Sequence, residues 1–293
     1  MLCTHAGPRA RDSDPNPWRC VRAEHAPYRW LIADSKVVYQ SGKGLAALER
    51  GVLAALALLG RRPTAWREVW DALASDACDV LRTLPWHVDY DAPVPLEAES
   101  HEIQALVPFV DQGLRAAGVR LVGLRSRAIF EAEFNRLVEQ CGSKGTLLSH
   151  ATLELAARSL APLRSGPISV LCDKHGGRNA YRQLLSEWFP ESVVEVYGEG
   201  PEESLYRLGP AERRIEFRFR ARGETCLPAA LASMASKYVR ELSMRAMNAF
   251  WRARVPGLAP TAGYPADARR FKAAIAAAQA ALGIDDRLLW RIR

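Results

Sequence analysis

Apolar side chains recur at helical spacing through the first 120 residues of the chain. In Thr64–Leu84, four large apolar residues lie three or four positions apart on one helical face, namely Trp66, Val69, Trp70 and Leu73. The ten residues Gly51–Gly60 carry no polar side chain, which indicates a buried helix. The pattern predicts helices at Gly44–Leu59, Thr64–Leu84 and Glu102–Ala117, with a linker or insertion loop that contains three prolines at Pro85–Glu99.

Shorter apolar runs in the second half of the chain are typical of strands. Ile168–Asp173 is a continuous apolar run that ends in an acid, the pattern of a strand buried on both faces of a sheet. In Arg213–Ala221, apolar residues alternate with charged ones, which predicts a strand with one buried face. Further strands are predicted at Ser192–Tyr197 and Ser204–Leu208, and one or two more at Val119–Phe130.

Helical patterns separate these strands. We expect a polar loop from Asn135 through the CGSKG sequence, then helices at Leu147–Leu160, after Asn179, from Pro228 to Trp251 and at Ala266–Leu282. Proline suits the start of a helix, because the N–H that it lacks would have no partner there. Strands mixed with helices predict an α/β fold, a mixed sheet flanked by helices with a C-terminal helical segment. Residues 1–27 are expected to be a disordered or irregular lead, and residues 28–293 one domain with a helical insertion at about 60–120.

The composition favours a folded protein of the cytoplasm. Hydrophobic residues make up 48% of the 293, and eight each of Trp, Tyr and Phe exclude disorder of the whole chain. Six cysteines lie far apart without a C-x-x-C pair, which suits a reducing compartment and offers no zinc cage. The longest apolar run has ten residues, about half of a membrane span. We therefore expect a monomeric cytoplasmic protein that does not enter a membrane.

The formal net charge of +7 comes mainly from arginine. A guanidinium group binds phosphate in a bidentate manner, so nucleic acid is one candidate partner. A GC-rich genome that encodes Arg in place of Lys throughout explains the same composition without any polyanionic partner.

Two acids lie where an α/β sheet binds ligands. Asp173 ends an apolar strand, and ligands of open α/β sheets gather outside the carboxyl ends of strands. A turn residue, or an acid paired with Lys174, is the structural alternative. Glu224 lies between a predicted strand and the long helix, where it could instead only cap that helix. Two converging carboxylates could hold Mg²⁺, which prefers oxygen ligands.

Polar residues also form a stripe on the long helix, and an aromatic residue follows it in the chain. Ser233, Lys237 and Glu241 are spaced four apart, with Arg240 beside them. The stripe is either a solvated face with a Lys–Glu pair or a phosphate-binding surface; Lys before Glu is the less favourable order for a pair. Tyr264 could stack on a base or sugar, or only pack.

Several segments, in order along the chain, resemble the type 2 ribonuclease H (HII) family. The most specific match is the helix ALASMASKYVREL, which resembles the family's Ala-Ser-x-x-Ala-Lys-x-x-Arg-Asp helix without a gap. The other matching segments are LIADSK, SHATLELAARSLAPL running into VLCDKHGG, RGETCLP and PTAGYP. The resemblance covers roughly residues 29–275.

The resemblance implies a ribonuclease H-like sheet and a metal-dependent endonuclease. Its substrate would be the RNA of RNA/DNA hybrids, or single ribonucleotides embedded in DNA. Asp173 and Glu224 would be catalytic ligands of Mg²⁺ or Mn²⁺. The residues implied to bind substrate are Lys36, Ser233, Lys237, Arg240 and Tyr264.

The sequence departs from the family at its N-terminus. Family members begin with a strand that carries Gly-x-Asp-Glu-Ala-Gly and supplies two of four metal-binding acids, whereas no Asp-Glu pair precedes LIADSK here. Glu also replaces Asp at positions 224 and 241, and Arg222 replaces Lys. Either the true start lies upstream of Met1, or the chain is a decayed paralogue that binds hybrid duplexes without cleaving them, or the fold has a structural role. We favour the first, because the segment around Asp173 matches the family undamaged.

Overall fold

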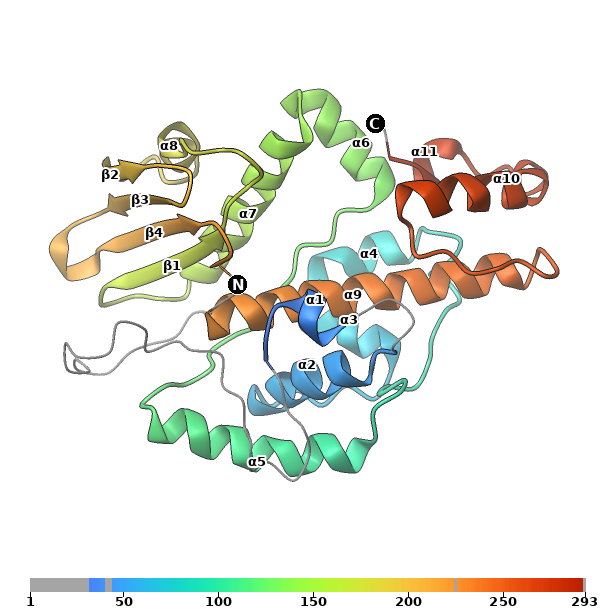
Figure 1. Ribbon diagram of the computed structural model, residues 1–293, viewed down its shortest axis with the longest axis horizontal. Helices are drawn as coiled ribbons and strands as arrows, with labels where there is room; N and C mark the ends of the chain where they lie inside the picture. The colour runs from blue at the N-terminus through green and yellow to red at the C-terminus, as the bar shows by residue number, and fades with distance from the viewer. Residues whose placement is uncertain (1–31, 40–43, 224–225, 292–293) are drawn as a thin grey trace.

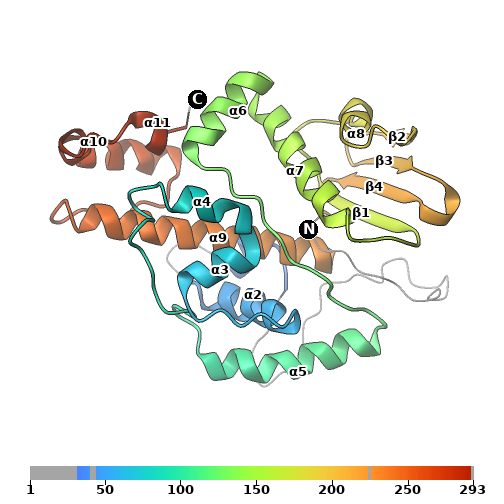
Figure 2. The ribbon, with the colours of Figure 1, turned by 180° about the vertical axis from the view of Figure 1, so that it is seen from behind.

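The computed structural model describes residues 32–39, 44–223 and 226–291. It shows a mixed α/β protein in which a four-stranded sheet and a group of helices form two separate hydrophobic cores (Figure 1). The sheet lies at one end of the molecule and the C-terminal helices at the other, with the helix α9 (Leu227–Arg252) between them (Figures 1 and 2). The predicted α/β class is therefore confirmed.

The sheet unit comprises residues 144–223. Its strands are β1 (Ile168–Asp173), β2 (Val194–Glu199), β3 (Glu203–Leu208) and β4 (Ile215–Arg220), in the spatial order β1-β4-β3-β2. β1 is parallel to β4, and the other neighbours are antiparallel. Helices α7 (Lys144–Leu160) and α8 (Arg182–Trp188) supply Leu153, Ala156 and Leu185 to the same core as the strands.

Alternation in the strands decides which face of the sheet is buried. In β4, Phe217 and Phe219 are fully buried, while the charged residues that alternate with them, Glu216, Arg218 and Arg220, lie on the opposite, more exposed face. The prediction of a strand with one buried face is confirmed there. For β1 the prediction was wrong: it is an edge strand of the described sheet, and only Val170 and Cys172 of its six residues are buried. Leu171, on the open face, is apolar but only half-buried. An apolar residue on each face made the run resemble that of a strand buried on both sides.

The helical unit comprises residues 32–39, 44–116 and 226–291. Besides α9, its helices are α1 (Ser35–Val38), α2 (Ala46–Leu58), α3 (Trp66–Ala74), η1 (Ser75–Ala77), α4 (Cys78–Leu81), α5 (Ser100–Ala116), α10 (Pro265–Ala281) and α11 (Asp286–Leu289). Trp66 is fully buried against α9, and its indole N–H donates to the Leu242 carbonyl at 3.1 Å. Most of the range from about 60 to 120, predicted as an insertion, is thus helical, and Trp66 joins it to the long helix. That it is an insertion stays a prediction.

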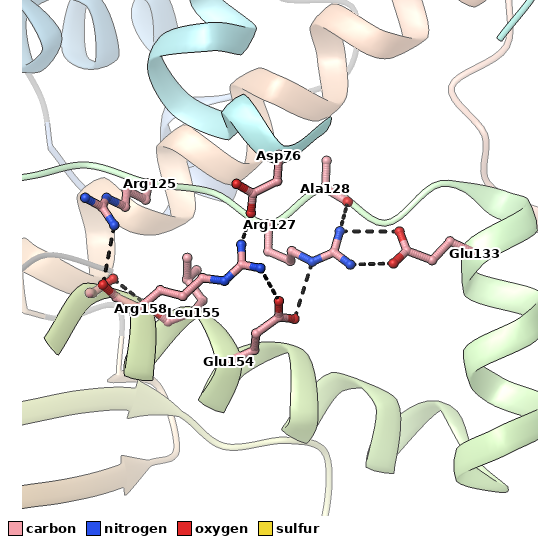
Figure 3. Close-up of polar contacts among 9 residues, drawn as sticks. Asp76, Arg125, Arg127, Ala128, Glu133, Glu154, Leu155 and Arg158 are labelled. Carbon is pink, nitrogen blue, oxygen red and sulfur yellow. Dashed lines mark hydrogen bonds and ion pairs between the residues drawn. The ribbon is translucent and has the colours of Figure 1, made fainter. Parts of the chain in front are cut away.

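A polar network connects the two units (Figure 3). Arg127, in the segment that crosses between them, pairs with Glu133 of α6 (Glu131–Cys141) and with Glu154 of α7. Arg158 of α7 pairs with Glu154 and with Asp76 of η1. Polar contacts of this kind are common at interfaces between domains.

Three predicted elements differ from the structure. The strands predicted at Val119–Phe130 are wrong: apart from a single β-bridge residue at Leu121, this segment crosses the molecule without regular secondary structure, and it buries Leu124 and Phe130 in the helical core. The loop predicted from Asn135 is also wrong as far as Cys141, because α6 continues to that residue. The single helix predicted at Thr64–Leu84 is divided into α3, η1 and α4. None of the helices in the described ranges is long and apolar enough to cross a membrane.

Candidate functional site

Asp173 lies at the carboxyl end of β1, with its side chain exposed. Its Oδ1 accepts a hydrogen bond from the backbone N–H of Gly223 at 3.2 Å. The loop after β4 makes this approach possible: Arg222 has a φ of +59°, and a Cβ on Gly223 would lie 3.4 Å from the Cys172 carbonyl oxygen. The end of β1 and the residue that precedes Glu224 are therefore in contact.

Glu224 itself lies outside the described residues. Its predicted convergence with Asp173 on one metal ion consequently stays a prediction. Within the described ranges, no three His, Cys, Asp or Glu side chains are grouped closely enough to hold a metal ion. Asp173 contributes hard oxygen ligands, of the kind that Mg²⁺ and Mn²⁺ prefer.

The residues that follow Asp173 have structural partners of their own. The Lys174 ammonium donates to Asn179 Oδ1 at 2.8 Å and to Ser204 Oγ at 3.1 Å. It forms no ion pair with Asp173, so that structural alternative is wrong. His175 is buried, its Nδ1 lies 3.0 Å from Ser149 Oγ, and burial lowers its pKa to about 4. His175 is therefore a neutral core residue at physiological pH.

The polar stripe of α9 is covered in part by the segment around α1. Ser233 Oγ donates to Ser35 Oγ at 2.8 Å, and Tyr39 Oη donates to Glu241 Oε2 at 3.0 Å. The partners in these two bonds are 198 and 202 residues apart, so the DSK segment belongs to the same surface as the stripe. Lys36 is exposed on α1, and its backbone N–H is capped by Asp34 at 2.8 Å.

Charged residues of the stripe form a compact cluster. Lys237 Nζ lies 2.9 Å from Glu241 Oε1, and Arg240 Nη1 lies 2.6 Å from the same oxygen. The predicted Lys–Glu pair is therefore confirmed, with Arg240 as a second cation on that carboxylate. Burial and the neighbouring Glu241 raise the pKa of Tyr39 to about 12, so the phenol stays protonated and donates.

Tyr264 lies next to the same cluster. Its side chain is 53% exposed, and the Arg240 guanidinium carbon is 5.4 Å from the centroid of its ring. Arg240 also donates through Nη2 to the carbonyl of Ala262, which holds the loop before α10 against α9. Gly263 turns there with a φ of +74°, and a Cβ on it would come within 3.3 Å of Arg240.

The structure thus brings Ser233, Lys237, Arg240 and Tyr264 together, with the exposed Lys36 on the adjoining helix α1. At about 1.5 Å per residue, Ser233 and Arg240 are about 10 Å apart along α9. Asp173 lies beside Gly223, in the loop that leads into the N-terminal end of α9. Sequence reasoning missed Tyr39 as a member of the cluster, and no local pattern around Tyr39 would have identified it.

Comparison of the chain with models of protein families, with curated proteins and with solved structures finds no significant match.

Proposed function

We propose that the chain is a metal-dependent endoribonuclease of the ribonuclease HII type, which acts on RNA/DNA hybrids or on ribonucleotides embedded in DNA. One observation supports this proposal above the others. Segments that resemble the family only as separate stretches of sequence contact one another in space: Ser35 of the DSK segment bonds Ser233 of the long helix, Tyr264 lies beside Arg240, and Asp173 accepts from Gly223. Contacts between distant segments at these positions are what a shared substrate would require.

In this proposal the acids hold the divalent ion. Asp173 uses Oδ1 for the Gly223 N–H, which leaves Oδ2 free of that bond and the side chain accessible. Glu224 would supply the second carboxylate. When bound, Mg²⁺ or Mn²⁺ neutralises phosphate charge and makes a water molecule more acidic. The Gly223 N–H orients the Asp173 carboxylate, as hydrogen bonds to ligating carboxylates commonly do.

The stripe of α9 would hold the substrate. Lys237 and Arg240 provide the cations for backbone phosphates, because each has more N–H donors than Glu241 and Ala262 occupy. Tyr264 presents an exposed ring beside Arg240, where a sugar or base could pack. Ser233 and Lys36 border the same surface.

The open edge of β1 bears on where further ligands of the same metal ion could lie. In the described sheet β1 has a neighbour on one side only, so the backbone groups of its other edge have no strand partner. Such an edge can accept a further strand. A parallel strand there would end beside Asp173, which is where additional acids for the same ion would have to lie.

A non-catalytic module that binds hybrid duplexes is the second candidate. The observation that favours it is the cationic cluster of Lys237 and Arg240 beside the exposed ring of Tyr264, which needs no metal ion to bind a nucleic-acid backbone. Binding without cleavage requires the cluster and Tyr264 but not the acids.

One experiment distinguishes these functions. The full chain is incubated with a labelled DNA duplex that contains a single ribonucleotide, with and without Mg²⁺. Mg²⁺-dependent nicking at the ribonucleotide is the expected result. Salt-sensitive binding without nicking would instead favour the binding module, and neither binding nor nicking would contradict both.

A further inference from the structure

Glu241 is the hub of the charged cluster on α9. Its carboxylate binds three donors, two from α9 and one from the segment after α1, namely Lys237 Nζ at 2.9 Å, Arg240 Nη1 at 2.6 Å and Tyr39 Oη at 3.0 Å. The side chains of Glu241 and Lys237 are only 14% and 17% exposed, whereas that of Arg240 is 37% exposed. A carboxylate so placed is shielded from solvent and faces the protein, while Arg240 reaches the surface.

The other contacts of the two cations give each a fixed direction. The Lys237 ammonium lies 4.6 Å from the centroid of the Tyr39 ring. The hydroxyl of the same tyrosine donates to Glu241, which binds Lys237, so Tyr39 fixes the ammonium both directly and through Glu241. The Arg240 guanidinium extends from Glu241 to the Ala262 carbonyl and lies over Tyr264. These contacts restrict the rotamers of both long side chains, which lowers the entropic cost of binding an anion.

Charge in the cluster is also balanced by Glu241. Two cations and one carboxylate leave a net charge of +1. Glu131 at the start of α6 also interacts electrostatically with Arg240. Without Glu241, two like charges would face each other across one helical turn, where they repel and disperse. A surface with uncompensated cations attracts any polyanion, whereas a compensated and fixed pair favours a phosphate in one position.

We infer that Glu241, supported by Tyr39, is a positioning residue that directs Lys237 and Arg240 toward one substrate phosphate and limits non-specific attraction of polyanions. The inference rests on the proposed function and deepens it. It assigns discrimination between duplexes to a residue that touches no substrate.

The test compares Glu241→Gln with the matched control Glu216→Gln. Glu216 also binds two arginines, Arg207 at 2.9 Å and Arg218 at 2.7 Å, and is 19% exposed, but it lies on the open face of the sheet. Both substitutions raise the net charge of the protein by one. Dissociation constants are measured for an RNA/DNA hybrid and a DNA duplex of the same sequence, each over a range of salt concentrations.

For Glu241→Gln we expect tighter binding to both duplexes at low salt and a salt slope that is steeper by about 0.9, the contribution of about one additional phosphate contact. We also expect the preference for hybrid over DNA to fall by about tenfold, as when one charge-assisted hydrogen bond is no longer held in place. Glu216→Gln should change neither quantity. Tyr39→Phe, which keeps the charge and the ring, should lower the preference for hybrid and leave the salt slope unchanged.

The outcomes separate the inference from the proposed function. A wild type that prefers hybrid, with Glu241→Gln and Glu216→Gln alike in slope and preference, overturns the inference alone. The inference is also overturned if Glu241→Gln weakens binding to both duplexes equally, because that is the result of a purely structural role. A wild type that binds neither duplex overturns the proposed function, and the inference with it.

Discussion

Glu49 of α2 offers the sharpest test of how the helical unit is held together. Its carboxylate is fully buried and accepts four hydrogen bonds. Oε1 takes the Leu96 N–H at 2.6 Å and the Tyr238 hydroxyl at 3.1 Å, while Oε2 takes the N–H groups of Glu97 and Ala98 at 2.7 and 2.8 Å. The loop before α5 and the middle of α9 are thus bound to one side chain of α2.

The perturbation is Glu49→Gln, which keeps the shape of the side chain and replaces one oxygen by NH₂. In its best orientation the amide nitrogen replaces Oε1, and the Tyr238 hydroxyl turns to accept from it. Burial and Glu49 raise the pKa of Tyr238, so it remains a hydroxyl in either arrangement. The Leu96 N–H and one amide hydrogen are then left without an acceptor. At about 1 kcal/mol for each buried unpaired donor, the substitution should cost at least about 2 kcal/mol of unfolding free energy.

Urea denaturation followed by tryptophan fluorescence measures this cost, since Trp66 and Trp70 lie in the same core. With an m-value of about 3 kcal/mol/M, the midpoint should fall by about 0.7 M. The control is Asp111→Asn, which removes an exposed ion pair with Arg115 at 2.8 Å and should cost less than about 1 kcal/mol. Equal midpoints for the two variants would refute the assignment of Glu49 as the anchor of this loop.

Two further predictions concern stability. His87 and His175 are buried, and burial lowers the pKa of each to about 4. They stay neutral in the folded protein while the unfolded chain takes up their protons. The free energy of unfolding should therefore fall by about 1.6 kcal/mol for each histidine as the pH decreases from 6.5 to 5. A flat profile in equilibrium urea titrations would contradict this. The second prediction concerns the network of Figure 3. Arg127→Met should lower the free energy of unfolding by about 2 kcal/mol, because the Arg127 side chain is 18% exposed and pairs with two acids. Arg158→Met should lower it by less than about 1 kcal/mol, because the Arg158 side chain is 47% exposed. Thermal unfolding of both variants tests the difference, and similar losses would show that burial does not set the strength of these pairs.

Local patterns predicted the sheet unit well. The bounds of β1 agree with its apolar run, and the alternation of Ile215, Phe217 and Phe219 predicted β4 because one face of that strand is buried. Pro228 marked the first turn of α9 within one residue of the observed start. These elements follow from side chains that act within their own segment.

Elements that depend on distant partners were missed. The apolar residues of the segment Val119–Phe130 predict strands, but they pack on the helical core, and within the described residues only Leu121 of this segment forms a β-bridge. Asn135 was taken for a loop residue, whereas its buried amide donates to the Trp290 carbonyl at 2.8 Å and so connects α6 to the end of the chain. Its neighbours alone carry no sign of that contact.

The candidate site shows the same division. Spacing along α9 placed Lys237 and Glu241 on one helical face and left a Lys–Glu pair as one of two interpretations, and the structure shows that pair. The position of Tyr39 on that pair, and of Tyr264 beside Arg240, required the fold, since these contacts join segments far apart in the chain.

The nuclease proposal is tested most directly by Asp173→Asn in the assay with a single ribonucleotide in a DNA duplex. This variant keeps the shape of the side chain and an acceptor for the Gly223 N–H but removes the charge that would hold the divalent ion. Asp89→Asn, at an exposed acid of the helical unit, is the control. We predict that the initial rate of Mg²⁺-dependent nicking falls at least about 100-fold for Asp173→Asn, with duplex binding and the control unchanged. Nicking by Asp173→Asn at the wild-type rate would contradict the account.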